Sequence, residues 1–162
     1  MYDLEQHKQQ ARLLKKENKR FLQKLKKRPP KDLDQVVRDL DAEVWEEVDC
    51  LQCANCCKSI SPVFKSKDIE RISQALKMKP GEFTSEFLQI DEDDDYVLKS
   101  APCPFLLADN RCEIYEVRPN ACREYPHTGK RKFHQLLDLT YKNTLYCPAA
   151  LKVVEGMKKT YS

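Results

Sequence analysis

Eight cysteines in a chain of 162 residues are the side chains most able to do chemistry. Four crowd into the octet CLQCANCC, at Cys50, Cys53, Cys56 and Cys57, and the other four are Cys103, Cys112, Cys122 and Cys147. Thiols at this density are typical of disulfides, metal ligation or redox chemistry. The rest of the sequence favours one of these three.

The expected compartment argues for metal. The stretch Met1–Gln10 is polar and lacks the apolar core of a secretory signal, and no segment approaches the roughly 20 apolar residues of a membrane span. We therefore expect a cytoplasmic protein without a transmembrane segment, in a reducing environment where disulfides are rare. A bridge between neighbours such as Cys56 and Cys57 would also be strained. Disulfides and redox thiols remain the lesser alternatives.

The spacing suits more than one metal centre. Cys50, Cys53 and Cys56 form a Cys-x2-Cys-x2-Cys run that one loop can wrap around a centre, as in bacterial ferredoxins. A Cys-x2-Cys pair is equally half of a structural zinc site. Eight thiolates could form two four-cysteine zinc sites, or one iron–sulfur cluster with surplus thiols. Thiolate ligands suit both metals, so the choice between Zn²⁺ and an iron–sulfur cluster stays open.

Four blocks of sequence carry a family resemblance. CLQCANCC is followed by CPFL at 103–106, CEIYEVRPNACREYP at 112–126 and CPAA at 147–150. In this order they resemble the CxxCxxCC family of zinc- or iron-chelating proteins, the YkgJ-type cysteine cluster proteins. The resemblance spans about residues 50–155. It implies a small, mostly helical fold that chelates a metal through its cysteines.

The resemblance also implies a set of site residues. The metal ligands carried over are Cys50, Cys53, Cys56, Cys57, Cys103, Cys112, Cys122 and Cys147. Arg118 and Arg123 lie in the same block, and we expect them to offset the charge of a thiolate cage and to orient it. Two neighbouring aromatic residues, Phe105 and Tyr115, are expected in the core.

Two classes of function follow. The first is a metal-binding module with a structural or metal-handling role. The second is an iron–sulfur enzyme that modifies a protein substrate, because flagellin lysine methylases have a similar cysteine block and are associated with a cluster. No nucleotide-binding glycine loop and no HExxH motif occurs, which favours the first class without deciding whether the protein is an enzyme.

Hydrophobic periodicity predicts a mainly α fold. Helices are expected over about residues 4–27, 33–48, 66–78, 82–88, 133–143 and 148–160, with a strand at 96–99 in one small hairpin. Asp32 and Gln35 have the spacing of a capping box. The predicted organisation is an N-terminal helical arm or hairpin over residues 1–49, then a cysteine-cluster domain over 50–162 with irregular metal-binding loops.

The arm is strongly basic. Residues 1–31 hold eleven Lys and Arg against three Asp and Glu, whereas the remaining residues carry an acidic excess. The ordinary interpretation is a solvated amphipathic helix that packs on the second helix. The alternatives are a contact with nucleic acid, through phosphates, or with a partner protein or membrane surface.

Overall fold

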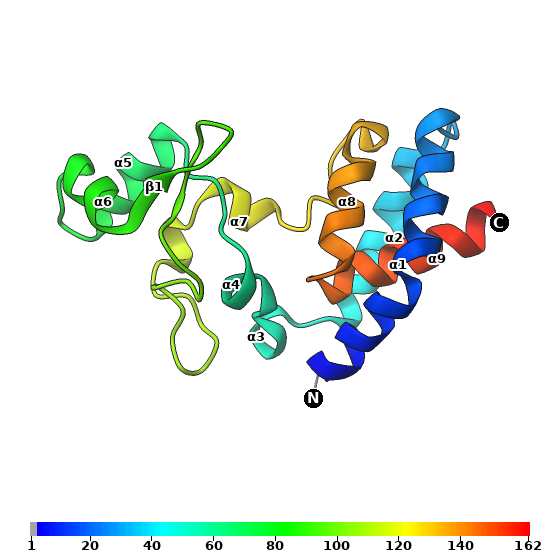
Figure 1. Ribbon diagram of the computed structural model, residues 1–162, viewed down its shortest axis with the longest axis horizontal. Helices are drawn as coiled ribbons and strands as arrows, with labels where there is room; N and C mark the ends of the chain where they lie inside the picture. Colours follow the sequence, from blue (N-terminus) through cyan, green and yellow to red (C-terminus); the bar gives the residue numbers. More distant parts are fainter. Residues whose placement is uncertain (1–2) are drawn as a thin grey trace. The chain divides into compact units, whose positions relative to one another are not determined.

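The computed structural model describes residues 3–162 and is mainly helical, as the sequence predicts (Figure 1). The chain folds into two compact units. The helical unit comprises Met1–Cys53 and Pro126–Ser162, and the cysteine unit comprises Ala54–Tyr125. None of the helices within the described residues has both the length and the hydropathy to cross a membrane.

The helical unit is built from the two ends of the chain. Its helices are α1 (Leu4–Lys27), α2 (Leu33–Glu47), α3 (Cys50–Cys53), α8 (Leu137–Thr144) and α9 (Pro148–Tyr161), with a 3-10 turn η2 (Phe133–Leu136) before α8. The sequence predicts the bounds of α1, α2 and α9 to within a few residues, and predicts one helix over 133–143 where the structure has η2 followed by α8; it does not predict α3. Proline sets several of them: Pro29 and Pro30 follow the end of α1, and Pro148 occupies the first turn of α9.

The packing of the N-terminal helices differs from a hairpin. α1 packs mainly against α8, and α2 packs mainly against α9. The approach of α2 to α9 is close at Gly156, where an added Cβ would lie 2.6 Å from a methyl group of Leu40. The N-terminal helices therefore complete a core with the C-terminal helices, and the expected α1–α2 pairing is wrong.

The expected capping box at the start of α2 is also absent. Asp32 is the N-cap residue, but its side chain accepts no hydrogen bond from the helix amides. It accepts one from the hydroxyl of Tyr161, at 2.9 Å, while Gln35 donates to Asp39. A tertiary contact with α9 replaces the local cap.

The cysteine unit is smaller and more irregular. It contains α4 (Asn55–Ser59), α5 (Ser66–Ala75), α6 (Pro80–Phe87), η1 (Tyr115–Val117) and α7 (Asn120–Glu124). The hairpin joins β1 (Leu88–Ile90) to β2 (Tyr96–Leu98) antiparallel, with Leu88 opposite Leu98. The predicted strand is thus confirmed, and its partner begins where α6 ends.

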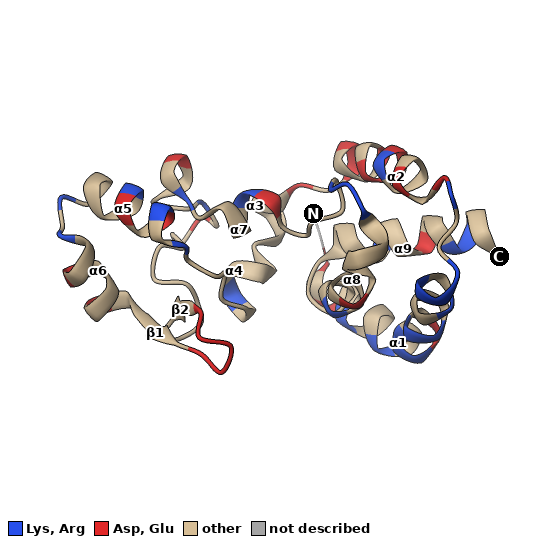
Figure 2. Ribbon diagram, turned by 90° about the horizontal axis from the view of Figure 1, so that it is seen from above, with Lys and Arg blue, Asp and Glu red and all other residues tan. Residues whose placement is uncertain are grey.

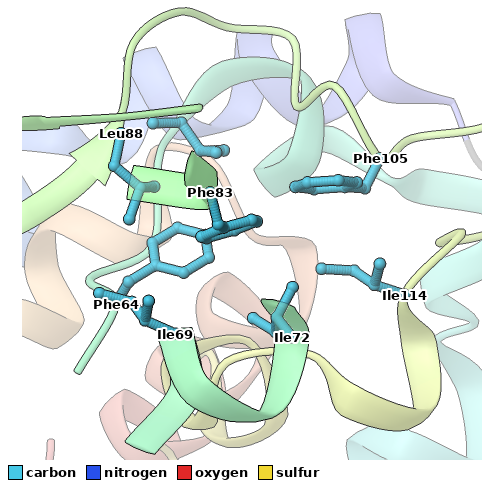
Figure 3. Close-up of a cluster of buried hydrophobic side chains, with 8 residues drawn as sticks. Phe64, Ile69, Ile72, Phe83, Leu88, Phe105 and Ile114 are labelled. Carbon is cyan, nitrogen blue, oxygen red and sulfur yellow. The ribbon is translucent and has the colours of Figure 1, made fainter. Parts of the chain in front are cut away.

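An aromatic cluster holds the cysteine unit together (Figure 3). Its buried members are Phe64, Ile69, Ile72, Phe83, Leu88, Leu98, Phe105 and Ile114. Phe83 is fully buried, and its ring lies 6.2 Å from that of Phe105, nearly parallel. The cluster joins α5, α6 and the hairpin to the loop that carries Cys103 and Cys112, and it therefore positions that loop.

Candidate metal centre

The octet is helical where a wrapping loop was expected. Cys50 and Cys53 lie in α3, and Cys56 and Cys57 lie in α4. Ala54 separates the two short helices in a left-handed conformation, with φ of 47°. The run CLQCANCC is consequently not one continuous helix, and its first two cysteines belong to the helical unit while the last two belong to the cysteine unit.

Backbone hydrogen bonds tie three cysteine-bearing segments of the cysteine unit together. The amide of Cys103 donates to the carbonyl of Cys57 at 2.8 Å, which joins the next segment to α4. The amide of Glu113 donates to the carbonyl of Phe105, also at 2.8 Å, so the chain after Cys103 folds back on itself. Cys112 is paired with Leu106 by an isolated bridge. Residues 103 and 112, nine apart in sequence, are therefore held near each other.

The aromatic cluster anchors the same loop. Phe105 and Ile114 are buried, and each follows a cysteine by two residues. Cys103 and Cys112 are partly buried and pack against the cluster. Phe105 is thus a core residue, as expected, and the two thiols are fixed by packing rather than left on a mobile loop.

Asp68 and Arg71, on α5, hold the segment with Cys122. The carboxylate of Asp68 is only 1% exposed and accepts hydrogen bonds from the amides of Lys65 at 2.9 Å and Asn120 at 3.2 Å. Asn120 begins α7, the helix that carries Cys122. The guanidinium of Arg71 binds Asp68 at 2.8 Å and donates to the carbonyls of two residues just before α7, Val117 and Arg118.

The four thiols in these segments influence one another electrostatically. Burial, with smaller contributions from the nearby Cys57, Cys103 and Cys112, raises the pKa of Cys122 to about 12. Burial raises the pKa of Cys103 to about 11, again with contributions from Cys57 and Cys112. Burial followed by the influence of Cys57 raises the pKa of Cys112 as well. These four cysteines form one group, which we call the four-thiol group.

Cys57 is the acidic member of the group. A hydrogen bond from the thiol of Cys56 lowers its pKa to about 7, against the effect of burial, and Lys58 contributes to the lowering. At neutral pH, Cys57 is therefore the member of the group most readily present as a thiolate, which is the form that binds a metal.

Arg118 and Arg123 shape the loop beside the group. The positive charge of Arg118 favours the thiolates of Cys112 and Cys122. Its guanidinium lies 3.9 Å from the centre of the Tyr115 ring, and Arg123 donates to the carbonyl of Glu116 at 2.7 Å. Tyr115 is 53% exposed under this arginine, so the expectation that it belongs to the core is wrong.

A second set of thiols lies in the helical unit. Burial raises the pKa of Cys147 to about 12, the amides of Ala149 and Ala150 at the start of α9 oppose the rise, and Cys50 and Cys53 add to it. Cys147 and Cys53 are buried, whereas Cys50 is exposed. Within this unit the structure therefore brings the last cysteine near the first two of the octet.

Neither set converges on a point. Among residues 3–162, no three His, Cys, Asp or Glu side chains come close enough together to hold one metal ion. Seven of the eight predicted ligands thus fall into these two sets, and Cys56 forms a hydrogen bond with Cys57, but the ligand set itself stays a prediction. Sequence analysis missed Asp68 and Arg71; the only signal was a carboxylate in the first turn of the helix that begins at Ser66.

Comparison with known proteins identifies the domain. No curated protein and no solved structure matches the chain. The model of one family, CxxCxxCC, described as "Putative zinc- or iron-chelating domain", matches residues 49–147. This range includes all eight cysteines and more than half of the chain, and the chain therefore belongs to the CxxCxxCC family.

Proposed function

We propose that the four-thiol group binds a metal centre and that the cysteine unit is a metal-binding module with a structural or metal-handling role. The observation that carries the proposal is the set of backbone contacts within one compact unit that joins Cys103 to Cys57 and folds Cys112 back beside Cys103, with Cys122 on the helix anchored by Asp68. Four thiolates are a complete ligand set for a structural Zn²⁺ or for an iron–sulfur cluster.

The residues around the group fit this purpose. A tetrahedral zinc site has Zn–S distances of about 2.3 Å, so binding requires the four sulfur atoms to move closer together. Cys103 and Cys112 already pack on the aromatic cluster, and Cys122 lies in a helix whose first amide is held by Asp68. The positive charge of Arg118 offsets part of the negative charge that four thiolates bring. The same surroundings are compatible with iron, which preparations exposed to air would lose before zinc because zinc has no redox chemistry.

The size of the unit gives the metal a structural role. Small domains bury a low fraction of their surface and commonly need a metal or disulfides for stability. The buried hydrophobic core of the cysteine unit is a single cluster, and the described segment 100–128 is mostly loop and short turns. Metal binding would therefore contribute directly to the folding of this unit.

The remaining cysteines extend the proposal. Cys50, Cys53 and Cys147 are proposed as ligands within the helical unit, and Cys56 is proposed as a ligand from its place in the octet. Eight reactive thiols are best maintained in the reducing cytosol, and a cytoplasmic location belongs to the same proposal.

An iron–sulfur enzyme is the second candidate. A depression of about 380 Å³ lies beside the group, and Cys112, Tyr115 and Val117 are among the residues that line it. A substrate bound there would contact Cys112, one of the residues proposed to hold the centre. Modification of a protein substrate, with the cluster as the cofactor, is the form of this candidate that the family resemblance suggests.

The test combines anaerobic purification with cysteine variants. Elemental and sulfide analysis of the parent gives the metal, and a broad visible absorption that bleaches on reduction indicates a cluster. Cys57→Ser and Cys122→Ser should each lose the same share of the metal, and the double variant should lose no more than either single variant. Non-additivity is expected because both residues serve one centre.

Cys122→Ser combined with Cys147→Ser is the matched control. These residues belong to different sets, so the double variant should lose more metal than Cys122→Ser alone. A larger loss for Cys57→Ser with Cys122→Ser than for the single variants would contradict the four-thiol group. A folded parent with eight titratable thiols and no metal would contradict the function itself.

A further inference from the structure

Helix α1 carries an exposed stripe of positive charge. Arg12, Lys16 and Arg20 follow one another at four-residue intervals, and Lys27 lies near the same face at the end of the helix. All four side chains are exposed, and they lie opposite the buried residues of α1, such as Ala11 and Leu22. At 1.5 Å per residue the stripe is about 22 Å long. The Lys and Arg positions along α1 are visible in Figure 2.

No acidic residue of α1 neutralises the stripe. Asp3 caps the helix by accepting the amides of Glu5 and Gln6, and Glu5 pairs with Lys8 at 3.1 Å. Glu17 pairs with Lys158 of α9 at 3.3 Å. In the part of the chain that the structure describes, the four stripe residues form no ion pair.

Two other cations of α1 are engaged within the helical unit and are separate from the stripe. Lys26 pairs with Asp138 of α8 at 2.5 Å, and the ammonium of Lys19 lies 6.0 Å from the centre of the Tyr141 ring. Lys26 and Lys19 therefore stabilise the contact with α8, whereas the four stripe residues have no anionic partner within the described part of the chain.

Further positive charge gathers at the C-terminal end of the stripe. The carboxylate of Asp34, in the first turn of α2, accepts the amides of Lys132 at 2.8 Å and Phe133 at 2.9 Å. These bonds hold the segment with Arg131 and Lys132 against the start of α2, close in sequence to Lys31 in the link between α1 and α2. All three of these Lys and Arg side chains are exposed.

We propose that the stripe binds the phosphate backbone of a nucleic acid. Arg12, Lys16 and Arg20 follow one another at about 6 Å along the helix, within the Debye length of about 8 Å at physiological salt, so these three charges act on a polyanion together. Lys and Arg contacts to phosphates supply affinity without reading sequence. The expected ligand class is therefore RNA or DNA, bound without strong sequence preference.

The packing of α1 disfavours the other partners. An amphipathic helix binds a membrane surface through its apolar face, but that face of α1 is buried against α8 and α9. Protein interfaces are depleted in Lys and depend on aromatic or apolar anchors at their centre. Within the described part of α1, Leu13 is the one exposed large hydrophobic side chain, at 82% exposure. A single leucine provides no such apolar centre.

The experiment measures fluorescence anisotropy of labelled single-stranded RNA and of DNA of the same sequence, titrated with the full chain at several salt concentrations. Binding on the order of 1–100 µM is expected at physiological salt, and tighter binding at low salt. A variant with Arg12, Lys16, Arg20 and Lys27 all changed to Gln should bind at least tenfold more weakly. The slope of log affinity against log salt should fall by about 3, the value for four lost contacts to a single strand.

A charge-matched control changes Lys67, Lys77, Lys79 and Lys159 to Gln. These four side chains are exposed and belong to elements other than α1, and the variant loses the same net charge. It should keep the affinity of the parent to within about twofold. Comparison of the RNA and DNA arms identifies the preferred polymer.

The proposal is overturned if the parent binds neither polymer, if the control variant weakens as much as the stripe variant, or if vesicles of anionic lipid are bound more tightly than both polymers. Circular dichroism of each variant verifies that α1 remains helical, which is expected because every substitution is at an exposed position.

Discussion

The buried carboxylate of Asp68 offers a direct test of how the cysteine unit holds Cys122. The substitution Asp68→Asn keeps the size of the side chain but removes its charge. The carboxylate has three donors: the amides of Lys65 and Asn120, and the guanidinium of Arg71 at 2.8 Å. An amide oxygen can satisfy only part of this set, and the new NH2 group faces donors.

The expected loss of stability is about 2–3 kcal/mol. A hydrogen bond to a charged group contributes about 1.5–3 kcal/mol, and a neutral one about 1 kcal/mol. Each of the three bonds to Asp68 would therefore lose about 0.5–2 kcal/mol when the charge is removed. We expect a total near the lower end, because the side chain of Arg71 is 33% exposed and keeps its carbonyl partners, Val117 and Arg118. Denaturant unfolding of the cysteine unit at neutral pH measures this change.

The same substitution should weaken metal binding. Asn120 is the first residue of α7, so losing its anchor frees the helix that carries Cys122. Loss of a group that orients a ligand commonly costs 10–100-fold in metal affinity. Competition with a chelator measures this effect separately from unfolding.

Asp109→Asn is the matched control. Asp109 also pairs with an arginine, Arg111 at 2.6 Å, but both side chains are more than half exposed. Exposed pairs contribute little to stability. If Asp68→Asn had the unfolding midpoint and chelator resistance of Asp109→Asn, the positioning role of Asp68 would be refuted.

The pH dependence supplies an independent check. Burial by itself raises the pKa of Asp68, but the hydrogen bonds and Arg71 outweigh it and hold the pKa below the ordinary 3.8. A lowered carboxyl pKa contributes stability above the unfolded value, and this contribution is lost as pH falls through the folded value. The difference between parent and Asp68→Asn should therefore be constant near neutrality and should shrink below about pH 4.

Two further predictions concern the helical unit and its contacts. Burial lowers the pKa of His7, which is 2% exposed, so the unfolded chain binds a proton more readily than the folded chain. The free energy of unfolding should therefore fall as pH drops below 6.5. His7→Asn should remove part of this pH dependence in unfolding experiments, and the exposed control His134→Asn should not. Gly156→Ala should lower the free energy of unfolding by about 1 kcal/mol, because the new Cβ would displace Leu40. Gly81→Ala in α6 has open space around it and should raise the free energy of unfolding by about 0.5–1 kcal/mol. Equal effects of the two variants in thermal unfolding would contradict the close contact between α2 and α9.

The sequence predicts the helices well because their signals are local. An apolar side chain every three or four residues and a proline at the boundary are enough to place α1, α5 and α9. The sequence predicts only one strand of the hairpin. The other strand, β1, begins at Leu88, which is the last residue of the helix predicted over 82–88. Such a short strand has too few residues to show an alternation of its own.

The errors share a physical cause, which is long-range contact. Asp32 has a capping pattern, but Tyr161 supplies a competing hydrogen bond from the other end of the chain. Tyr115 has the composition of a core residue, but the guanidinium of Arg118 stacks on it at the surface. The pairing of α1 with α8 depends on which apolar faces match in space, and one helix pattern contains no information about its partner. The predicted boundary between residues 49 and 50 remains a prediction, whereas the contacts group the chain into the two units described above.

The grouping of the cysteines follows from the same long-range contacts. Spacing alone does not separate Cys56 from Cys57, yet the contacts place Cys57 beside Cys103, Cys112 and Cys122, and a hydrogen bond with Cys56 lowers the pKa of Cys57 to about 7. Burial raises the pKa of Cys103 and Cys122 to about 11 and about 12, so near neutral pH these two bind a metal only by releasing protons. The packing that positions the thiols also keeps them protonated. A metal that displaces those protons binds all four thiolates only when the cysteine unit is folded. Metal binding therefore stabilises the folded unit over conformations in which the thiols are apart, and couples the ligand geometry to the fold.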